Sequence, residues 1–417
     1  MSFITSATRM WLTRSFEPFT FKNEYNQILP FQDTTQLGLY VHIPFCMSIC
    51  SFCPYCKVIY NPVVCDEYIN YLIEEIHMVG SQNGNKKEVT SLYFGGGSPA
   101  LALNRLGEVI SAIKEHFIIT EGIGLELHPE NIDVETLEHL KKIGVTKVSI
   151  GIQSFQPLHL EVLGRKKTDY TRMFQALERV PFETVSMDFI FALPNQTITD
   201  LKTDIEMAFD YGANHIAIYP FINFTFANSK IPPIDKKLKR KLMDEITLYC
   251  QAKGYHRDSI WTFSKDDKAK YSSMTRDNFL GFGCSATTLL KDQFKVNTFS
   301  IQEYQKRIEQ GKLPTSLTIH FKKRQRMLYY LFWTAYSTKI DAREFEMFFG
   351  EALTKNFGLE LWLAKHLGFI IEQNGVYSMT LKGAFYYHYY ENYYTLSYID
   401  KMWGIMREEA FPEYILL

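Results

Sequence analysis

From about residue 38, short runs of β-branched and aromatic residues alternate with longer segments whose apolar residues recur every three or four positions. The short runs are typical of buried strands, and the periodic segments are typical of helices that bury one face. The expected strands are 38–43, 89–94, 123–128, 147–152, 184–191 and 215–221, and the expected helices between them are 65–79, 104–117, 134–144 and 199–212. This alternation predicts an α/β fold with parallel strands and helical crossovers, as an open wound sheet or part of a barrel.

Polar and glycine residues fall at the ends of these expected strands. Cys46 follows the first strand, Gly95–Gly97 follow the second, Glu126 lies at the end of the third, Gln153 follows the fourth and Asp188 lies in the fifth. Parallel strands bring such positions to one common edge, where α/β folds place their chemistry. The pattern therefore predicts one site built from several loops.

The pattern changes after residue 225. Residues 228–241 are rich in Pro and Lys and indicate a connector, and residues 302–417 are mainly helical in pattern. The expected division is an N-terminal segment (1–37), a barrel (38–225), a barrel extension with connector (226–300) and a mainly helical C-terminal domain (301–417). Near the end, Tyr386, Tyr390, Tyr393 and Tyr394 recur at helical spacing, which favours a packed helix face or, alternatively, a surface that binds a planar substrate.

Composition and charge narrow the class of protein. Hydrophobic residues make up 46% of the 417 and the formal net charge is −1, so the chain reads as a globular protein without the basic surplus of a nucleic-acid binder. No apolar run approaches the roughly 18 residues that span a bilayer. Arg9, Arg14 and Glu17 interrupt the N-terminal apolar residues, so no signal peptide is expected and the expected location is the cytoplasm.

Four of the seven cysteines lie within "HIPFCMSICSFCPYCK", residues 42–57. A structural zinc site draws ligand pairs from separated segments, whereas three thiolates on one loop suit a [4Fe-4S] cluster with one open iron. Cys46, Cys50 and Cys53 form C-x3-C-x2-C and are the expected ligands, and Cys56 is either a fourth ligand or a structural residue. Cys65 and Cys250 are expected to pack as small apolar residues.

The C-x3-C-x2-C spacing, with Phe52 before the third cysteine, resembles the signature of the radical S-adenosylmethionine (SAM) superfamily. The resemblance implies that the open iron chelates SAM, and that one electron from the cluster cleaves SAM to methionine and a 5′-deoxyadenosyl radical. It also implies that the Gly95–Gly97 turn contacts the methionine part of SAM. A partial (β/α)6 radical SAM barrel, with a mainly helical C-terminal region, is the fold that follows.

A narrower resemblance covers residues 38–225 closely and extends loosely to 290. "LYVHIPFC", "LYFGGGSP", "LELHPE", "VSIGIQSF" and "MDFIFALPNQT" occur in the order seen in the family of oxygen-independent coproporphyrinogen III oxidase. Carried over by position, the resemblance places Tyr40 beside the cluster, and Glu126, Gln153, Arg165 and Asp188 around SAM, with a second SAM bound nearby. Arg165 has the plainest alternative, that of a surface residue.

The sequence also departs from the porphyrinogen oxidases. Their fourth cysteine would stand at Tyr55, residues 255–265 replace a family segment, and Cys284 takes the place of another small residue. These departures put decarboxylation of coproporphyrinogen in doubt. Other members of the same broad family are class C radical SAM methyltransferases, heme-opening enzymes and heme chaperones.

The leading hypothesis from the sequence is class C-type methyl transfer, with two SAM molecules, to an aromatic, heteroaromatic or quinone substrate. Tetrapyrrole chemistry, such as coproporphyrinogen III oxidation, is the alternative enzyme, and a heme chaperone-like binding protein is the alternative outside catalysis. His42, His128, His256 and Cys284 are the candidate catalytic residues. A flavodoxin or ferredoxin is the expected reductant, and residues 395–406 are expected to close the barrel mouth over a flat apolar substrate.

Overall fold

The computed structural model describes residues 3–166, 168–227, 229–265 and 277–417. Seven neighbouring parallel strands form the main part of its sheet. In spatial order they are β14 (Asn278–Phe282), β2 (Leu37–Ile43), β6 (Leu92–Gly96), β8 (Ile123–Leu127), β9 (Lys147–Gln153), β10 (Thr184–Phe191) and β11 (His215–Pro220). The chain therefore adds strands outward from β2, and β14 returns to pair with β2 on its other side.

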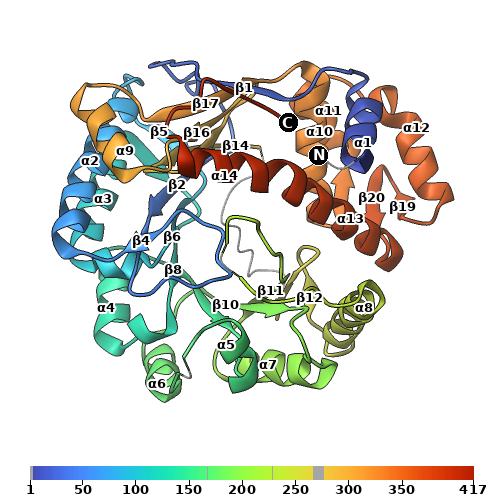
Figure 1. Cartoon of the computed structure of the whole chain (residues 1–417), viewed down its shortest axis with the longest axis horizontal. Coiled ribbons are helices and arrows are strands. Elements are labelled where there is room, and N and C mark those ends of the chain that lie inside the picture. The colour runs from blue at the N-terminus through green and yellow to red at the C-terminus, as the bar shows by residue number, and fades with distance from the viewer. Residues whose placement is uncertain (1–2, 167, 228, 266–276) are drawn as a thin grey trace.

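Helices connect these strands and cover the outer face of the curved sheet (Figure 1). They are α2 (Pro62–Gly80), α3 (Leu103–His116), α4 (Val134–Lys142), α5 (Pro157–Val162), α6 (Thr171–Arg179) and α7 (Ile198–Asp210). A right-handed crossover through a helix is the normal way to join parallel neighbours. The predicted α/β fold, a partial radical SAM-type barrel, is confirmed.

Two expected elements differ from the structure. The strand expected at 89–94 begins only at Leu92, because Lys87–Val89 forms a separate short strand, β5, that pairs with β7 (Phe117–Ile119). The Lys-rich residues expected as a connector include the start of helix α8 (Lys236–Ala252). The side chain of Asp235 accepts hydrogen bonds from the backbone N–H groups of Lys237 and Leu238, which caps that helix. Residues 228 and 266–276, within the expected connector and extension, lie outside the described residues.

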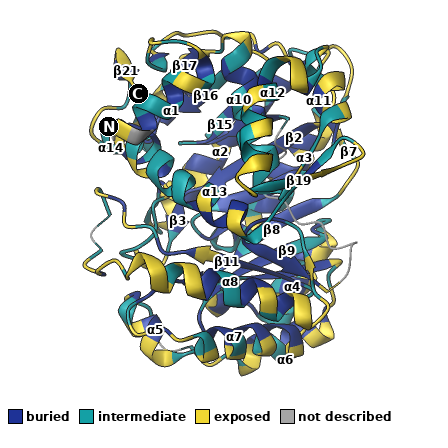
Figure 2. Ribbon diagram, turned by 90° about the vertical axis from the view of Figure 1, so that its right-hand side faces the viewer, coloured by how far each residue is buried: buried dark blue, intermediate teal, exposed yellow. Residues whose placement is uncertain are grey.

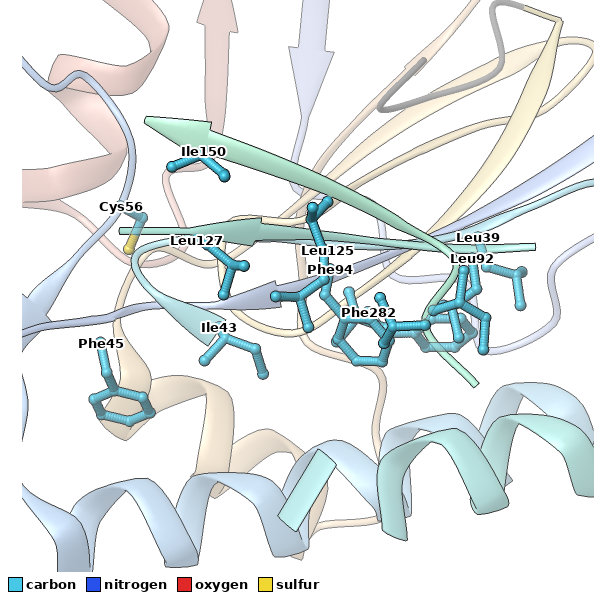
Figure 3. Packing of buried hydrophobic residues seen from close by; sticks show 14 of the residues in the cluster. Leu39, Ile43, Phe45, Cys56, Leu92, Phe94, Leu125, Leu127, Ile150 and Phe282 are labelled. Carbon is cyan, nitrogen blue, oxygen red and sulfur yellow. The ribbon is translucent and has the colours of Figure 1, made fainter. Parts of the chain in front are cut away.

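The main core lies between the sheet and its outer helices. Leu39, Phe94, Leu125 and Phe282 come from four adjacent strands and lie on the sheet above the helices in Figure 3. Figure 2 shows the strands as mostly buried and the outer helices as buried only on one side. A parallel sheet covered on both faces has this appearance, and its strands are continuous apolar runs rather than alternating apolar and polar residues.

Beyond β14 the sheet continues with antiparallel strands from distant parts of the chain. In order these are β15 (Thr287–Leu289), β16 (Gln293–Asn297), β17 (Thr315–His320), β1 (Thr20–Lys22) and β21 (Tyr414–Leu416). At the opposite edge, β13 (Thr262–Ser264) and β12 (His256–Arg257) extend the sheet past β11. The N-terminal and C-terminal segments thus lie together at one edge.

The last third of the chain is mainly helical, with a small sheet formed in order by β18 (Lys339–Asp341), β20 (Val376–Met379) and β19 (Ile370–Gln373). Its helices are α10 (Lys323–Tyr336), α11 (Ala342–Phe349), α12 (Leu353–His366), α13 (Leu381–Tyr394) and α14 (Asp400–Glu408). The tyrosines of α13 point to several sides: Tyr394 packs on Phe332 and Tyr398, whereas Tyr386 is exposed. Among the described residues, no helix has both the length and the apolar character needed to cross a bilayer.

Candidate functional site

The cysteine loop, residues 47–57, is fastened at both ends beside the C-terminal end of β2. Strand β3 (Phe45–Cys46) precedes it and pairs with β4 (Val58–Ile59), which follows it. The Val58 N–H donates to the Pro44 carbonyl at 2.8 Å and the Tyr60 N–H donates to the Cys46 carbonyl at 2.9 Å. The loop therefore closes on itself and presents its cysteines at the predicted edge of the sheet.

Cys46, at the end of β3, and Cys50 and Cys53, in the loop, are partly exposed free thiols. Burial raises the pKa of Cys46 to about 12, with smaller contributions from the nearby Cys53 and Cys50. Ligand atoms that hold one ion lie within about 4.8 Å of one another, and in the described part of the chain no such group contains all three thiols. Three neighbouring thiols at wider spacing suit a cluster of several irons better than a single ion.

His42 connects β2 to the far end of the loop. Its Nε2 lies 2.9 Å from the Cys56 carbonyl, which only accepts, so Nε2–H is the donor and Nδ1 accepts from the Tyr40 hydroxyl at 3.0 Å. Burial lowers the pKa of His42 to about 4. A neutral imidazole held on both nitrogens is a structural bridge, so the geometry gives His42 no role as a catalytic base.

Cys56 points into the protein interior. Its Sγ donates to the Phe299 carbonyl at 3.2 Å, and the ligand atoms of His42, Cys56 and Cys284 lie within 4.8 Å of one another. Cys284 has no exposed surface. Of the two roles considered for Cys56, the structure favours the structural one, and it leaves Cys284 without access to a substrate.

Glu75 on helix α2 holds the turn that carries Cys284. Its carboxylate accepts from the Gly283 N–H at 2.7 Å, from the Tyr304 hydroxyl at 2.7 Å and from the Asn297 amide at 3.0 Å. Burial raises the pKa of Glu75 to about 7, and these hydrogen bonds oppose the rise. Sequence reasoning missed Glu75, because a glutamate in an amphipathic helix normally lies on its solvent face.

The three glycines after β6 make room for protein groups. A Cβ on Gly97 would lie 2.4 Å from the Phe45 carbonyl oxygen, and one on Gly96, whose φ is +115°, would lie 2.7 Å from the His42 ring. A Cβ on Gly95 would lie 2.9 Å from Glu126 Oε1. The turn is thereby pressed against the start of the cysteine loop on one side and against Glu126 on the other.

Glu126 and Asp188 are two partly buried carboxylates of the site. Glu126 accepts from the Gly96 N–H at 3.1 Å and from the Tyr93 hydroxyl at 3.2 Å, and Asp188 accepts from the Ser149 hydroxyl at 2.8 Å. Burial raises the pKa of Glu126 to about 7, with a further contribution from the charge of Asp188, and burial raises that of Asp188 to about 6. Two carboxylates whose charges interact in this way are suited to attract a cation.

Arg165 and Gln153 come from the β9 end of the sheet. Gln153 ends that strand with φ at +70°, and the guanidinium of Arg165 donates to the Gly151 carbonyl and lies 5.7 Å from the ring centre of Phe52 in the cysteine loop. Arg165 Nε is buried and has no hydrogen-bond partner among the described residues. The Arg165 guanidinium therefore lies beside the cysteine loop, with one donor left for a bound group.

The two remaining candidate histidines are His128, which is already hydrogen-bonded, and His256, which lies far from the cysteine loop. His128 follows β8, its Nδ1 accepts from the Glu130 N–H at 3.3 Å, and burial followed by the charge of Arg165 lowers its pKa to about 4. His256 pairs with Ser264, which in turn pairs with His215 at the start of β11. This register places His256 at the end of the sheet opposite the cysteine loop, away from any reaction there.

Aromatic and basic residues from the C-terminal half complete the surroundings of the loop. Trp403 lies 6.1 Å from Tyr55 and 6.1 Å from Phe299, measured between ring centres, and Arg407 donates to the Pro54 carbonyl. Tyr55 is 51% exposed as a whole residue, but desolvation of its hydroxyl, followed by the charges of Glu126, Cys53 and Asp188, raises its pKa, so these carboxylates act on the hydroxyl. A hollow of about 520 Å³ between the loop and α14 is lined by residues including Cys50, Cys53, Tyr55, Phe226, Phe299 and Arg407.

These residues fit a [4Fe-4S] cluster and SAM: three thiols on one loop, an arginine with a free buried donor, and two carboxylates. Residues 40–208 match the Radical SAM superfamily. Over these residues the chain carries a Radical SAM domain, and it is a radical SAM enzyme. This domain implies a [4Fe-4S] cluster and SAM as cofactors.

Individual relatives carry two different names. The chain is 28% identical to the heme chaperone HemW of Bacillus subtilis, over 64% of this chain and 74% of that protein. It is 24% identical to the oxygen-independent coproporphyrinogen III oxidase of Synechocystis, over 73% of this chain and 70% of that protein. The structure of coproporphyrinogen III oxidase (HemN) from Escherichia coli has the same fold, with a TM-score of 0.73 at 20% identity, over 88% of this chain and 90% of that one.

Proposed function

We propose that this enzyme generates a 5′-deoxyadenosyl radical beside the cysteine loop and uses it on a flat, unsaturated small molecule of the tetrapyrrole kind. The single observation that carries the proposal is the position of the Arg165 guanidinium, which lies 5.7 Å from the ring centre of Phe52, between Cys50 and Cys53 in sequence, and close enough to Cys46 to act on its charge. When bound, the cluster supplies one electron to SAM, which splits into methionine and the radical. The names of the relatives, an oxidase and a heme chaperone, support the substrate class.

In this proposal the chain's own residues hold SAM. Arg165 would pair with the carboxylate of its methionine part, because its Nε is a buried donor without an acceptor among the described residues. Glu126 and Asp188 favour the positive sulfonium and accept from amino or hydroxyl groups. Trp403 packs on Tyr55 of the loop and would limit the access of water there, and a flavodoxin or ferredoxin would deliver the electron.

Methyl transfer with a second SAM is the second candidate function. It is favoured by Tyr55, which stands where the porphyrinogen oxidases have a cysteine and whose hydroxyl senses Glu126 and Asp188. None of the relatives described above carries a methyltransferase name, so this candidate ranks after tetrapyrrole chemistry. The heme chaperone alternative differs from both, because it requires no turnover of SAM.

One anaerobic experiment separates the three. The cluster-loaded protein receives dithionite and SAM with a deuterated methyl group, with and without porphyrinogens, porphyrins and quinones, and the products are identified by mass spectrometry. Substrate-dependent, unlabelled 5′-deoxyadenosine without S-adenosylhomocysteine supports direct attack on the substrate. Deuterated 5′-deoxyadenosine together with S-adenosylhomocysteine would replace the proposal with methyl transfer, and heme binding without 5′-deoxyadenosine would replace it with a chaperone role.

A further inference from the structure

A second group of ligand-type side chains lies on the outer helices, away from the cysteine loop. His77 is in the last turn of α2, and Glu115 and His116 end α3. The ligand atoms of these three residues all lie within 4.8 Å of one another. His77 Nδ1 is 2.9 Å from His116 Nε2 and 3.8 Å from Glu115 Oε2.

The fold positions these side chains closely. Gly80, at the end of α2, leaves the space that the His116 imidazole occupies, since a Cβ there would lie 2.3 Å from His116 Cγ. Any other residue at position 80 would push the imidazole away from His77. The His116 imidazole is only partly exposed, and its Nε2 faces His77 Nδ1.

Space for an ion and its remaining ligands lies beside the group. His77 and Glu115 line an open hollow of about 560 Å³ between α2, α3 and α4, which is also lined by residues including Asn104, Glu108, Ser111, His139 and Lys142. Ligand atoms at about 2.1 Å from one ion lie roughly 3 to 3.5 Å from each other. The two measured separations fall on either side of that range.

We propose that His77, Glu115 and His116 bind one divalent transition-metal ion of the Zn²⁺ class. Two imidazole nitrogens and one carboxylate oxygen favour Zn²⁺, Co²⁺ or Ni²⁺ over Mg²⁺ and Ca²⁺, which prefer oxygen ligands. The ion replaces the hydrogen bond between the two imidazoles. The ring that donates in this bond shifts its proton to its other nitrogen, where the accepting ring already carries its own, so two neutral rings release no net proton. Three protein ligands leave a coordination position for water.

An ion at this site ties the end of α2 to the end of α3. Helix α2 also carries Tyr68 and Glu75, which hold the backbone N–H groups of Cys284 and Gly283 behind the cysteine loop. The ion therefore braces the helix on which that support depends. Because it binds only the folded arrangement, it raises the melting temperature by mass action.

The test uses the cluster-loaded protein under anaerobic conditions, so that the three loop thiols are already occupied. Zn²⁺ is titrated in competition with a chromophoric chelator. We expect one Zn²⁺ per chain beyond the cluster. His77→Ala and His116→Ala should each weaken Zn²⁺ binding by roughly tenfold or more, because losing a ligand costs at least as much affinity as losing a residue that only hydrogen-bonds to a ligand. His139→Ala, a histidine of the same hollow outside the ligand set, is the matched control and leaves the affinity unchanged.

Two further measurements keep the proposal open to refutation. Glu115→Gln alters an exposed side chain that the fold does not need, so it weakens Zn²⁺ binding without lowering the melting temperature measured in chelator. The Cys46→Ala, Cys50→Ala, Cys53→Ala triple variant binds Zn²⁺ at the same site and separates it from zinc held by loop thiols. Equal stoichiometry and affinity in the wild type and the His77→Ala, His116→Ala double variant would overturn the proposal.

Discussion

The indole of Trp403 on helix α14 packs against the Tyr55 ring in the cysteine loop, with the ring centres 6.1 Å apart. The same indole stacks on Phe224 and contacts Phe299. The C-terminal helix is therefore a direct support of the loop that holds the candidate cluster, although the two lie near opposite ends of the sequence.

Replacing Trp403 with Ala should loosen the loop. Loss of these aromatic contacts removes much of the packing on its outer side, each pair being worth roughly 0.5–1.5 kcal/mol. We expect faster hydrogen–deuterium exchange in residues 47–57 of the Trp403→Ala variant. Trp362→Ala removes an exposed indole on α12 and serves as the control. Equal exchange in both variants would show that α14 does not support the loop.

The cluster ligands are predicted to be Cys46, Cys50 and Cys53 and not Cys56. Replacing any of the first three with Ala should abolish incorporation of a stable cluster, measured as iron and sulfide per chain after anaerobic reconstitution. Cys56→Ala should keep a full cluster, because that thiol is directed to the Phe299 carbonyl in the interior. Loss of iron in Cys56→Ala with a normal melting temperature would assign it as a ligand instead.

Binding of SAM should strengthen as the pH rises from 6 to 8. Burial raises the pKa of Glu126 to about 7, so this carboxyl is mostly protonated at pH 6 and mostly ionised at pH 8, and only the ionised form attracts the sulfonium. The ionised fraction changes roughly tenfold over this interval, which sets the largest expected gain in affinity. Equilibrium dialysis of SAM on the cluster-loaded protein measures it.

Glu126→Gln should flatten this pH profile, and Glu130→Gln, which changes a nearby exposed carboxylate, should leave it intact. Asp188, with a pKa raised to about 6, accounts for a smaller residual slope below pH 7. An unchanged slope in Glu126→Gln would remove Glu126 from the SAM site.

Glu75→Ala should strongly destabilise the fold. The substitution leaves the Gly283 N–H, the Tyr304 hydroxyl and the Asn297 amide without their buried acceptor. Each such loss costs roughly 1–3 kcal/mol, so the free energy of unfolding should fall by about 3 kcal/mol or more. Chemical denaturation measures this, and Glu74→Ala, its exposed neighbour on α2, should change it by less than about 0.5 kcal/mol.

The sequence was informative where local pattern determines the outcome. The strands β2, β8, β9, β10 and β11 could be predicted from their apolar runs, because a parallel sheet buries both faces. The cluster ligands could be predicted from the cysteine spacing, because the three thiols lie close together in sequence. Start and end positions were less certain, as the short strand β5 and the start of α8 show.

What the sequence did not reveal depends on distant contacts. No local signal distinguishes Glu75, which is buried, from Glu74, which is exposed, because only the turn at Gly283 decides between them. Likewise, His256 and Cys284 are ordinary polar candidates until the strand register places one at the far end of the sheet and the other inside the core. The contact of Trp403 with Tyr55 had no sequence signal beyond a general excess of aromatic residues.

The position of β14 beside β2 also bears on how the enzyme is made. Strand β2 and the cysteine loop leave the ribosome early, yet β2 pairs with residues 278–282, and Cys56 rests on the carbonyl of Phe299. Until those later residues emerge, β2 lacks one of its two neighbouring strands and Cys56 lacks its acceptor in the interior. We therefore expect stable insertion of iron and sulfide to follow translation of most of the chain, and truncated chains to retain a cluster poorly even though they carry all three cysteines.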